Sequence, residues 1–271
     1  MWLYLYSYLL AYLLIPAFFD MLLRGGLVRE NYQGKQLPLG MGIVILFVSG
    51  LSLITTLPLY WQTWEREGLV FLFLLALIGL LGLLDDVAGR ENVKGLKGHL
   101  SFFFSEGCIS TGLLKGLGGI CGSFFVSLLL ADSFSAFFQG GILLSLSINT
   151  MNLLDLRPGR AIKTFLFIMA MAFIGSGDKE PYFLFGSVIG AVLAYFPFDL
   201  KGQVMLGDTG ANVLGAVAGL ALFWSLSPWQ RLLAITFLAV LHVFCERHSL
   251  TKVIEGIPVL NFLDRLGRPE S

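Results

Sequence analysis

Four short polar clusters interrupt a chain that is otherwise strongly apolar. They are Asp85-Asp86, the set Asn149, Asn152 and Asp155, the run Gly207-Asp208-Thr209-Gly210, and the segment from His242 to His248. One aspartate at the centre of a bilayer costs about 2.5–3.5 kcal/mol on insertion scales. Several carboxylates beside apolar stretches therefore predict a chemical role, and metal-assisted handling of a phosphate is the chemistry that suits them.

Composition indicates a membrane protein. Of the 271 residues, 56% are hydrophobic and 13% are charged, against about 25% charged residues in soluble domains. We therefore expect residues 1–271 to form a single integral membrane domain. The formal net charge is zero, so total charge points to no partner, and no nucleic acid is expected.

A spanning helix needs about 20 mainly apolar residues. This length predicts an all-α fold, a polytopic transmembrane bundle with about nine spans. The first begins at the N-terminus, where no basic segment of a cleavable signal precedes it. The predicted spans are about 1–19, 39–59, 68–84, 114–131, 134–151, 161–177, 181–198, 209–227 and 229–245.

The basic residues are distributed very unequally between the two sides of this arrangement. Arg66, Lys179 and Arg231 fall on one side, and the remaining 15 of the 18 Lys and Arg residues fall on the other. Positively charged loops stay in the cytosol. We therefore expect a multi-pass cell-membrane protein with its N-terminus outside, its C-terminus cytosolic and all four polar clusters at the cytosolic face.

Asp85 and Asp86 point about 100° apart on a helix, so one can face a metal or substrate while the other orients a lysine. Two close carboxylates also raise one pKa, which suits a general base. The alternative is a pair of solvated carboxylates, but Asp at a helix C-terminus opposes the helix dipole. We therefore expect a catalytic role.

Asn149, Asn152 and Asp155 recur every three residues and form one polar ridge if the helix continues. The asparagines can bond a nucleotide or a sugar, and Asp155 can bind a metal or a basic side chain. Interhelical hydrogen bonding is the alternative for the asparagines.

Four basic residues are candidates for binding phosphate. Arg157 and Arg160 follow the Asn/Asp cluster, and Lys94 and Lys97 precede an aromatic run at 102–104. The two arginines could instead only enforce topology, and the two lysines could anchor the loop in the lipid interface. The pattern does not choose between these interpretations.

Asp208 opens the predicted span at 209–227, where the positive end of the helix dipole attracts anions. Alone it could be an N-cap. Beside the other carboxylates it becomes a candidate ligand for Mg²⁺, which one or two carboxylates, substrate phosphates and water usually hold.

His242, Glu246 and Ser249 share one helical face, and Arg247 and His248 lie beside them. Phosphate binding or proton handling is the functional interpretation of this segment. The alternative is snorkelling of long polar side chains toward the interface.

In this order and on this side, the clusters resemble those of the polyprenyl-phosphate N-acetylhexosamine-1-phosphate transferases, which are of the glycosyltransferase 4 type. The resemblance runs from about Lys35 to the C-terminus. The segments that carry it are Lys35 to Gly42, Leu84-Asp85-Asp86, Asn149 to Asp155, and Met205 to Gly215.

The resemblance implies that a polyprenyl phosphate attacks the β-phosphate of a UDP-activated amino sugar, so that UMP leaves and a polyprenyl-diphospho-sugar forms for cell-wall or surface glycans. It implies Asp208 as the ligand of Mg²⁺, with Mn²⁺ as an alternative, and Asp85 or Asp86 as the group that deprotonates or orients the lipid phosphate. Asn152 and Asp155 would sit at the nucleotide diphosphate. Lys35, in a segment like the family's first cytosolic loop, is expected to bind substrate, and a homodimer is expected at family level.

Two departures from the family pattern stand out. The usual continuation Asp-Gly-x-Asp-Gly reads Asp155-Leu-Arg157-Pro158-Gly159 here, and Ala211 stands where a serine is frequent. Because Pro158 replaces the second aspartate, we expect a short, divergent member with an altered nucleotide pocket.

Other classes of protein compete with the transferase. A lipid transporter would place polar groups near the bilayer midplane, whereas these gather at one face. A catalytically altered homologue that binds lipid phosphate or acts as a scaffold is the other alternative, and Pro158 and Ala211 motivate it. A CDP-alcohol phosphotransferase would carry a dense aspartate signature on one helix, which the sequence lacks.

Overall fold

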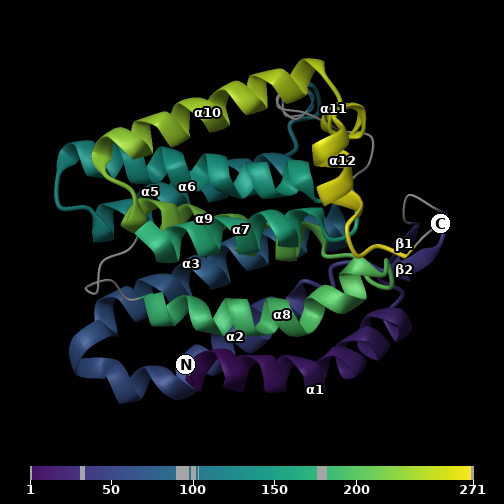
Figure 1. Ribbon diagram of the computed structural model, residues 1–271, viewed down its shortest axis with the longest axis horizontal. Coiled ribbons are helices and arrows are strands. Elements are labelled where there is room, and N and C mark those ends of the chain that lie inside the picture. Colours follow the sequence, from purple (N-terminus) through teal and green to yellow (C-terminus); the bar gives the residue numbers. More distant parts are fainter. Residues whose placement is uncertain are drawn as a thin grey trace.

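The computed structural model describes residues 2–30, 34–89, 98, 102, 104–175 and 182–269, and most of these residues are helical (Figure 1). The predicted all-α membrane bundle is confirmed, with one small antiparallel hairpin added, in which Val28 pairs with Pro38. The elements are α1 (Trp2–Arg24), β1 (Val28–Glu30), β2 (Gln36–Pro38), α2 (Ile43–Thr56), a 3-10 turn (Leu57–Tyr60), α3 (Trp61–Ala88), α5 (Thr111–Leu130), α6 (Phe134–Leu154), α7 (Arg160–Gly175), a 3-10 turn (Tyr182–Phe185), α8 (Gly186–Leu200), α9 (Gly207–Ser225), α10 (Pro228–Arg247), α11 (Leu250–Gly256) and α12 (Pro258–Arg265).

Six helices in the described part of the chain are long and apolar enough to cross a membrane. The three other predicted spans fall on α2, α7 and α9. Helices α2 and α7 have only 14 and 16 residues. The count of nine spans and the orientation therefore stay predictions. The six helices are Trp2–Arg24, Gln62–Ala88, Thr111–Leu130, Phe134–Leu154, Tyr182–Leu200 and Pro228–Arg247.

Helix α9 is the centre of the bundle. Every residue from Thr209 to Ala221 is buried, and the helix packs against α2, α3, α6 and α7. A helix that is apolar on all sides is stable only inside a protein or a membrane. Its position explains why α9 can carry Asp208 at its start, because the neighbouring helices supply partners for a carboxylate there.

Two glycines bring α9 against α6 at backbone distance. A Cβ added to Gly215 would lie 2.5 Å from the Cα of Ile148, and one added to Gly219 would lie 3.0 Å from the Cα of Leu144. Small residues four apart allow this close approach, and they recur at helix contacts in membranes. A methyl group added at either glycine therefore does not fit between the two helices unless one backbone shifts.

Gly215→Ala is therefore expected to lower the free energy of unfolding by about 1–3 kcal/mol, the usual cost of overpacking. Gly116→Ala is the matched control, since Gly116 is an exposed residue of α5 with no atom within 4 Å of an added Cβ. Alanine there should leave stability unchanged or raise it, because glycine weakens a helix interior. Thermal unfolding of both variants in detergent measures the difference, and equal melting temperatures would contradict the packing described.

Candidate active site

The carboxylate of Asp86 holds the first turn of α9. It accepts hydrogen bonds from the backbone N–H of Asp208 (2.9 Å), the backbone N–H of Thr209 (2.9 Å) and the Thr209 hydroxyl (2.6 Å). The N-terminus of a helix has unpaired N–H groups and a positive dipole end, so an anion is stable there. Asp86 is only 8% exposed, and it fastens the end of α3 to the start of α9.

Glycines let the first loop pack directly on this turn. A Cβ at Gly42 would lie 2.3 Å from the Cα of Gly210, and one at Gly207 would lie 2.8 Å from Oδ2 of Asp86. The N–H of Gly42 also donates to the carbonyl of Leu206 at 2.9 Å. The two segments that the sequence analysis compared with separate family motifs are thus one contiguous structure.

Lys115 joins two more carboxylates. Its Nζ lies 2.5 Å from Oδ2 of Asp85 and 2.8 Å from Oδ2 of Asp208. Sequence reasoning counted Lys115 only among the topology-setting charges and missed this role. The available signal was its place within the predicted span at 114–131, because a charged side chain in a membrane segment is a functional candidate by default.

Asp155 reaches the same turn from the end of α6. It is the residue that follows the helix, and the backbone N–H of Gly207 lies close enough to its carboxyl to lower the pKa. Burial, together with the neighbouring carboxylates of Asp199, Asp208 and Asp86, raises the pKa of Asp155 well above its ordinary value. Three of the four predicted clusters therefore meet at the start of α9.

Some amide atoms of asparagines in the segments that build this cluster make no hydrogen bond within the described residues. Asn149 is exposed, whereas Asn152 has a buried Oδ1 that makes no hydrogen bond within the described residues. Asn212, one turn after Asp208, is 1% exposed, and both of its amide atoms likewise lack a partner in that part of the chain. Sequence reasoning missed Asn212, although an amide inside an apolar helix is a signal in membranes. Such atoms suit an ordered water or a polar ligand.

The carboxylate oxygens of this cluster suit a magnesium ion whose remaining ligands would come from the substrate. Within the described residues, no group of three or more His, Cys, Asp or Glu side chains forms a metal site. Magnesium needs only one or two carboxylates when substrate phosphates and water complete its shell. Asp85 and Asp208 already turn one oxygen each toward the same cation, the ammonium of Lys115, so this pair of oxygens fits such a shared site.

The two predicted phosphate-binding arginines pair elsewhere. Arg157 lies 3.5 Å from Glu255. Arg160 makes a two-pronged ion pair with Asp264, at 2.8 and 2.9 Å, and both side chains are buried. Burial alone would raise the pKa of Asp264, but hydrogen bonds from Arg160 and Arg268 hold it below its ordinary value. The guanidinium of Arg160 is thus engaged by the protein and lies outside the carboxylate cluster.

The turn that departs from the family pattern is closed by protein groups. Gly159, with a φ of +75°, donates its N–H to Oδ2 of Asp199 at 2.7 Å. Nε of Arg268 donates to the carbonyl of Pro158 at 2.7 Å. The segment after Asp155 is therefore held by α8 on one side and by the end of the chain on the other.

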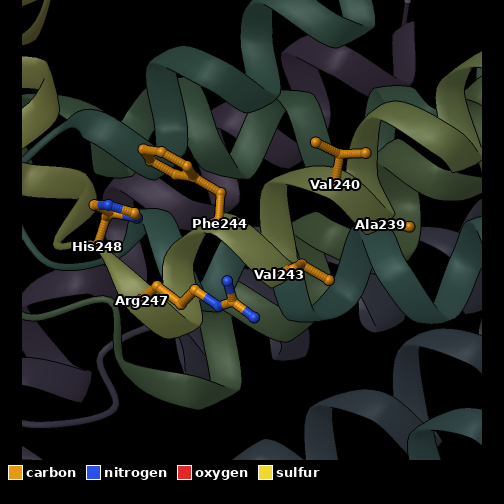
Figure 2. A pocket seen from close by; sticks show the side chains of 6 residues that line it. All are labelled: Ala239, Val240, Val243, Phe244, Arg247 and His248. Carbon is orange, nitrogen blue, oxygen red and sulfur yellow. The ribbon is translucent and has the colours of Figure 1, made fainter.

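The remaining candidates among the described residues lie on or directly after α10, or beside the hairpin. His242 donates from Nδ1 to the carbonyl of Leu238 at 2.7 Å, and Lys35 is exposed beside β2. Lys94 and Lys97 lie outside the described residues. The ring of His248 stacks on Phe244 with centroids 4.6 Å apart. A mainly apolar pocket of about 450 Å³ lies along α10. Figure 2 shows the side chains that line it, which are Ala239, Val240, Val243, Phe244, Arg247 and His248.

Comparison with known proteins gives one family and several relatives. The family model described as Glycosyl transferase family 4 matches residues 68–226, a range that contains Asp85, Asp86, Lys115, Asp155 and Asp208. The chain is 26% identical over 290 residues to the phospho-N-acetylmuramoyl-pentapeptide-transferase of Borrelia hermsii (strain HS1 / DAH), covering 93% of this chain and 81% of the relative.

Two further relatives carry the same name. The protein from Borrelia turicatae (strain 91E135) is 26% identical over 289 residues, with 93% of this chain and 80% of the relative covered. The protein from Enterococcus faecalis (strain ATCC 700802 / V583) is 26% identical over 232 residues, with 75% and 68% covered. The similarity to the first two thus extends over nearly the whole chain.

The neighbouring aspartates are expected to differ in their effect on stability. Asp86→Asn should lower the free energy of unfolding by about 1–3 kcal/mol, because an amide nitrogen would face N–H donors that now share a buried carboxylate. Asp85→Asn should have a smaller effect, since Lys115 keeps Asp208 as a partner. Melting temperatures of the two variants in detergent test this difference. A larger decrease in melting temperature for Asp85→Asn than for Asp86→Asn would refute it.

Proposed function

The chain belongs to glycosyl transferase family 4, and from this premise we propose that it transfers a sugar 1-phosphate from a UDP-activated amino sugar to a membrane polyprenyl phosphate with the help of Mg²⁺. It is a phosphotransferase, and its family and relatives support phospho-sugar transfer to a lipid phosphate. The products would be UMP and a polyprenyl-diphospho-sugar for cell-wall or surface glycans. The observation that carries the proposal is the ammonium of Lys115 held between Asp85 and Asp208.

In the proposed reaction an oxygen of the lipid phosphate attacks the β-phosphorus of the nucleotide sugar. A new phosphorus–oxygen bond forms, the bond to the bridging oxygen breaks, and UMP leaves with that oxygen and its electron pair. Asp86 already accepts three hydrogen bonds from α9. Asp85 is therefore the carboxylate left to orient the lipid phosphate and to take its proton.

Charge compensation is the main task in such a transfer, because the transition state spreads negative charge over the phosphoryl oxygens. When bound, Mg²⁺ would neutralise the phosphates and bring them into line, with Asp208 as its ligand. Lys115 supplies a fixed positive charge at the same place. The N-terminus of α9 adds the positive end of its dipole.

The pocket on α10 suits the lipid substrate. Its wall is apolar, and Arg247 and His248 stand at the end where α10 finishes. Because α10 follows α9 and runs back along the bundle, that end lies on the same side as the start of α9 (Figure 1). A polyprenyl chain could lie along Val240 and Val243 with its phosphate toward the cationic end.

Several finer points complete the proposal. The charge distribution supports a cytosolic active site, because 15 of the 18 basic residues fall on one side of the predicted topology. Mn²⁺ could replace Mg²⁺, and a homodimer is expected at family level. The altered turn after Asp155 supports a nucleotide pocket unlike the usual one.

Asp208→Ala is expected to abolish turnover, because it removes the proposed metal ligand. The measurement is release of UMP from a panel of UDP-amino sugars by purified protein with polyprenyl phosphate and Mg²⁺. Asp20→Ala is the matched control, since Asp20 is an exposed residue of α1 paired with Arg24. Unchanged turnover in Asp208→Ala would contradict the assignment of Asp208 as the ligand of Mg²⁺. Failure of the parent protein with the whole panel would favour the scaffold alternative.

Lys115→Met is expected to lower kcat by about 10²–10³, the usual cost of removing one preorganised group that stabilises transition-state charge. The Mg²⁺ concentration for half-maximal rate should also fall, since Lys115 no longer competes for Asp208. Titration of Mg²⁺ in the UMP assay measures both effects, with Lys201→Met, an exposed residue after α8, as the control. A normal kcat would exclude Lys115 from the reaction.

A further inference from the structure

Helix α12 has two chemically different faces. Val259, Phe262 and Leu263 are 68%, 65% and 50% exposed, whereas Asp264 on the opposite face is 9% exposed. Figure 1 shows α12 crossing the end of the bundle beside α7, while α10 runs along the bundle. The exposed apolar side chains therefore do not belong to a spanning helix.

Ion pairs hold α12 in this orientation. Asp264 binds Arg160 through both carboxylate oxygens and Arg268 through one, at 2.8–2.9 Å. The ammonium of Lys163 donates to the carbonyls of Leu263 and Asp264 at 3.0 and 2.9 Å. With its polar face fixed to α7, the helix cannot turn its apolar face toward the bundle.

The length of α12 excludes a span of its own. Its eight residues extend about 12 Å, less than half of the roughly 30 Å hydrocarbon core. Helix α10, which precedes α12 in the chain with only the short α11 between them, has no buried residue. It exposes Trp229, Phe237 and Val240. Apolar side chains of both α10 and α12 are thus exposed and available for contact with lipid.

Cationic side chains accompany this apolar face. Lys252 on α11 and Arg265 on α12 are both exposed, and the nearby carboxylate of Glu255 pairs with Arg157. Short helices with one apolar face and basic residues beside it lie in the plane of the membrane surface. Basic residues there are attracted to anionic lipid phosphates.

We propose that α12 is an interfacial helix, with its apolar face in the boundary between headgroups and acyl chains and with Lys252 and Arg265 at the lipid phosphates. Because Arg268 also binds the carbonyl of Pro158, this helix ties the turn after Asp155 to the membrane surface. The proposal does not depend on the transferase reaction, and its test uses no measurement of turnover.

Spin labels on cysteines in nanodiscs that contain anionic phospholipid test the proposal. In a background where Cys108, Cys121 and Cys245 are serine, labels at Val259→Cys and Phe262→Cys are expected to collide more with oxygen than with a water-soluble nickel complex. A label at Val240→Cys on α10 is the control for lipid contact. One at Glu255→Cys on α11, where the native side chain is 45% exposed, is the control for water contact.

Two outcomes would overturn the proposal. Nickel accessibility at Phe262→Cys equal to that at Glu255→Cys would mean that water covers the face. Low accessibility to both agents, with spin–spin broadening, would mean that a second copy covers it. Labelled proteins that keep the parent's melting temperature are compared, so a folding defect does not imitate either result.

A second variant tests the cationic part separately. Replacing Lys252 and Arg265 by glutamine in the Phe262→Cys protein should shift the label toward water, seen as higher nickel accessibility. These side chains are exposed, so the replacement leaves the buried pair of Arg160 and Asp264 in place. An unchanged label would overturn the role assigned to the lipid phosphates.

Discussion

Everything in the site depends on a buried carboxylate at the start of a buried helix. Asp86 accepts three hydrogen bonds from Asp208 and Thr209, and so it satisfies N–H groups that would otherwise be unpaired inside the bundle. The interaction fixes the end of α3 relative to α9. Asp85 points instead to Lys115, which is why the proposed reaction assigns the proton to Asp85.

The site is built by neighbouring helices that share charges. Lys115 of α5 compensates one carboxylate from α3 and one from α9, while Asp155 reaches the same turn from α6. Buried unpaired charges would be very costly. Glycines at 42 and 207 let the first loop and the carboxylate of Asp86 lie directly against the start of α9. In the proposed reaction, the same arrangement that keeps the carboxylates stable would supply a preorganised positive centre for the phosphates.

The aspartates of the cluster could be picked out from the sequence, because polar residues at the ends of apolar stretches are evident without knowledge of the fold. The nine predicted spans likewise coincide with helices, although α2 and α7 are short. Which helices become neighbours is not visible in the same way. Lys115 was therefore interpreted as a topology charge. Arg160 was left between phosphate binding and topology, because its partner, Asp264, lies 104 residues away. Hydropathy likewise gave no sign that the end of the chain would close the turn after Asp155.

That long separation has a consequence for biosynthesis. Arg160 and Asp264 bury their charges only against each other and their immediate neighbours. At about 5–20 residues per second, roughly 5–20 s pass between the synthesis of the two. During this interval the guanidinium of Arg160 lacks its carboxylate partner, so burying it would leave an unpaired charge. The contacts that close the turn after Asp155 can therefore form only once the segment that carries Asp264 and Arg268 has been synthesised.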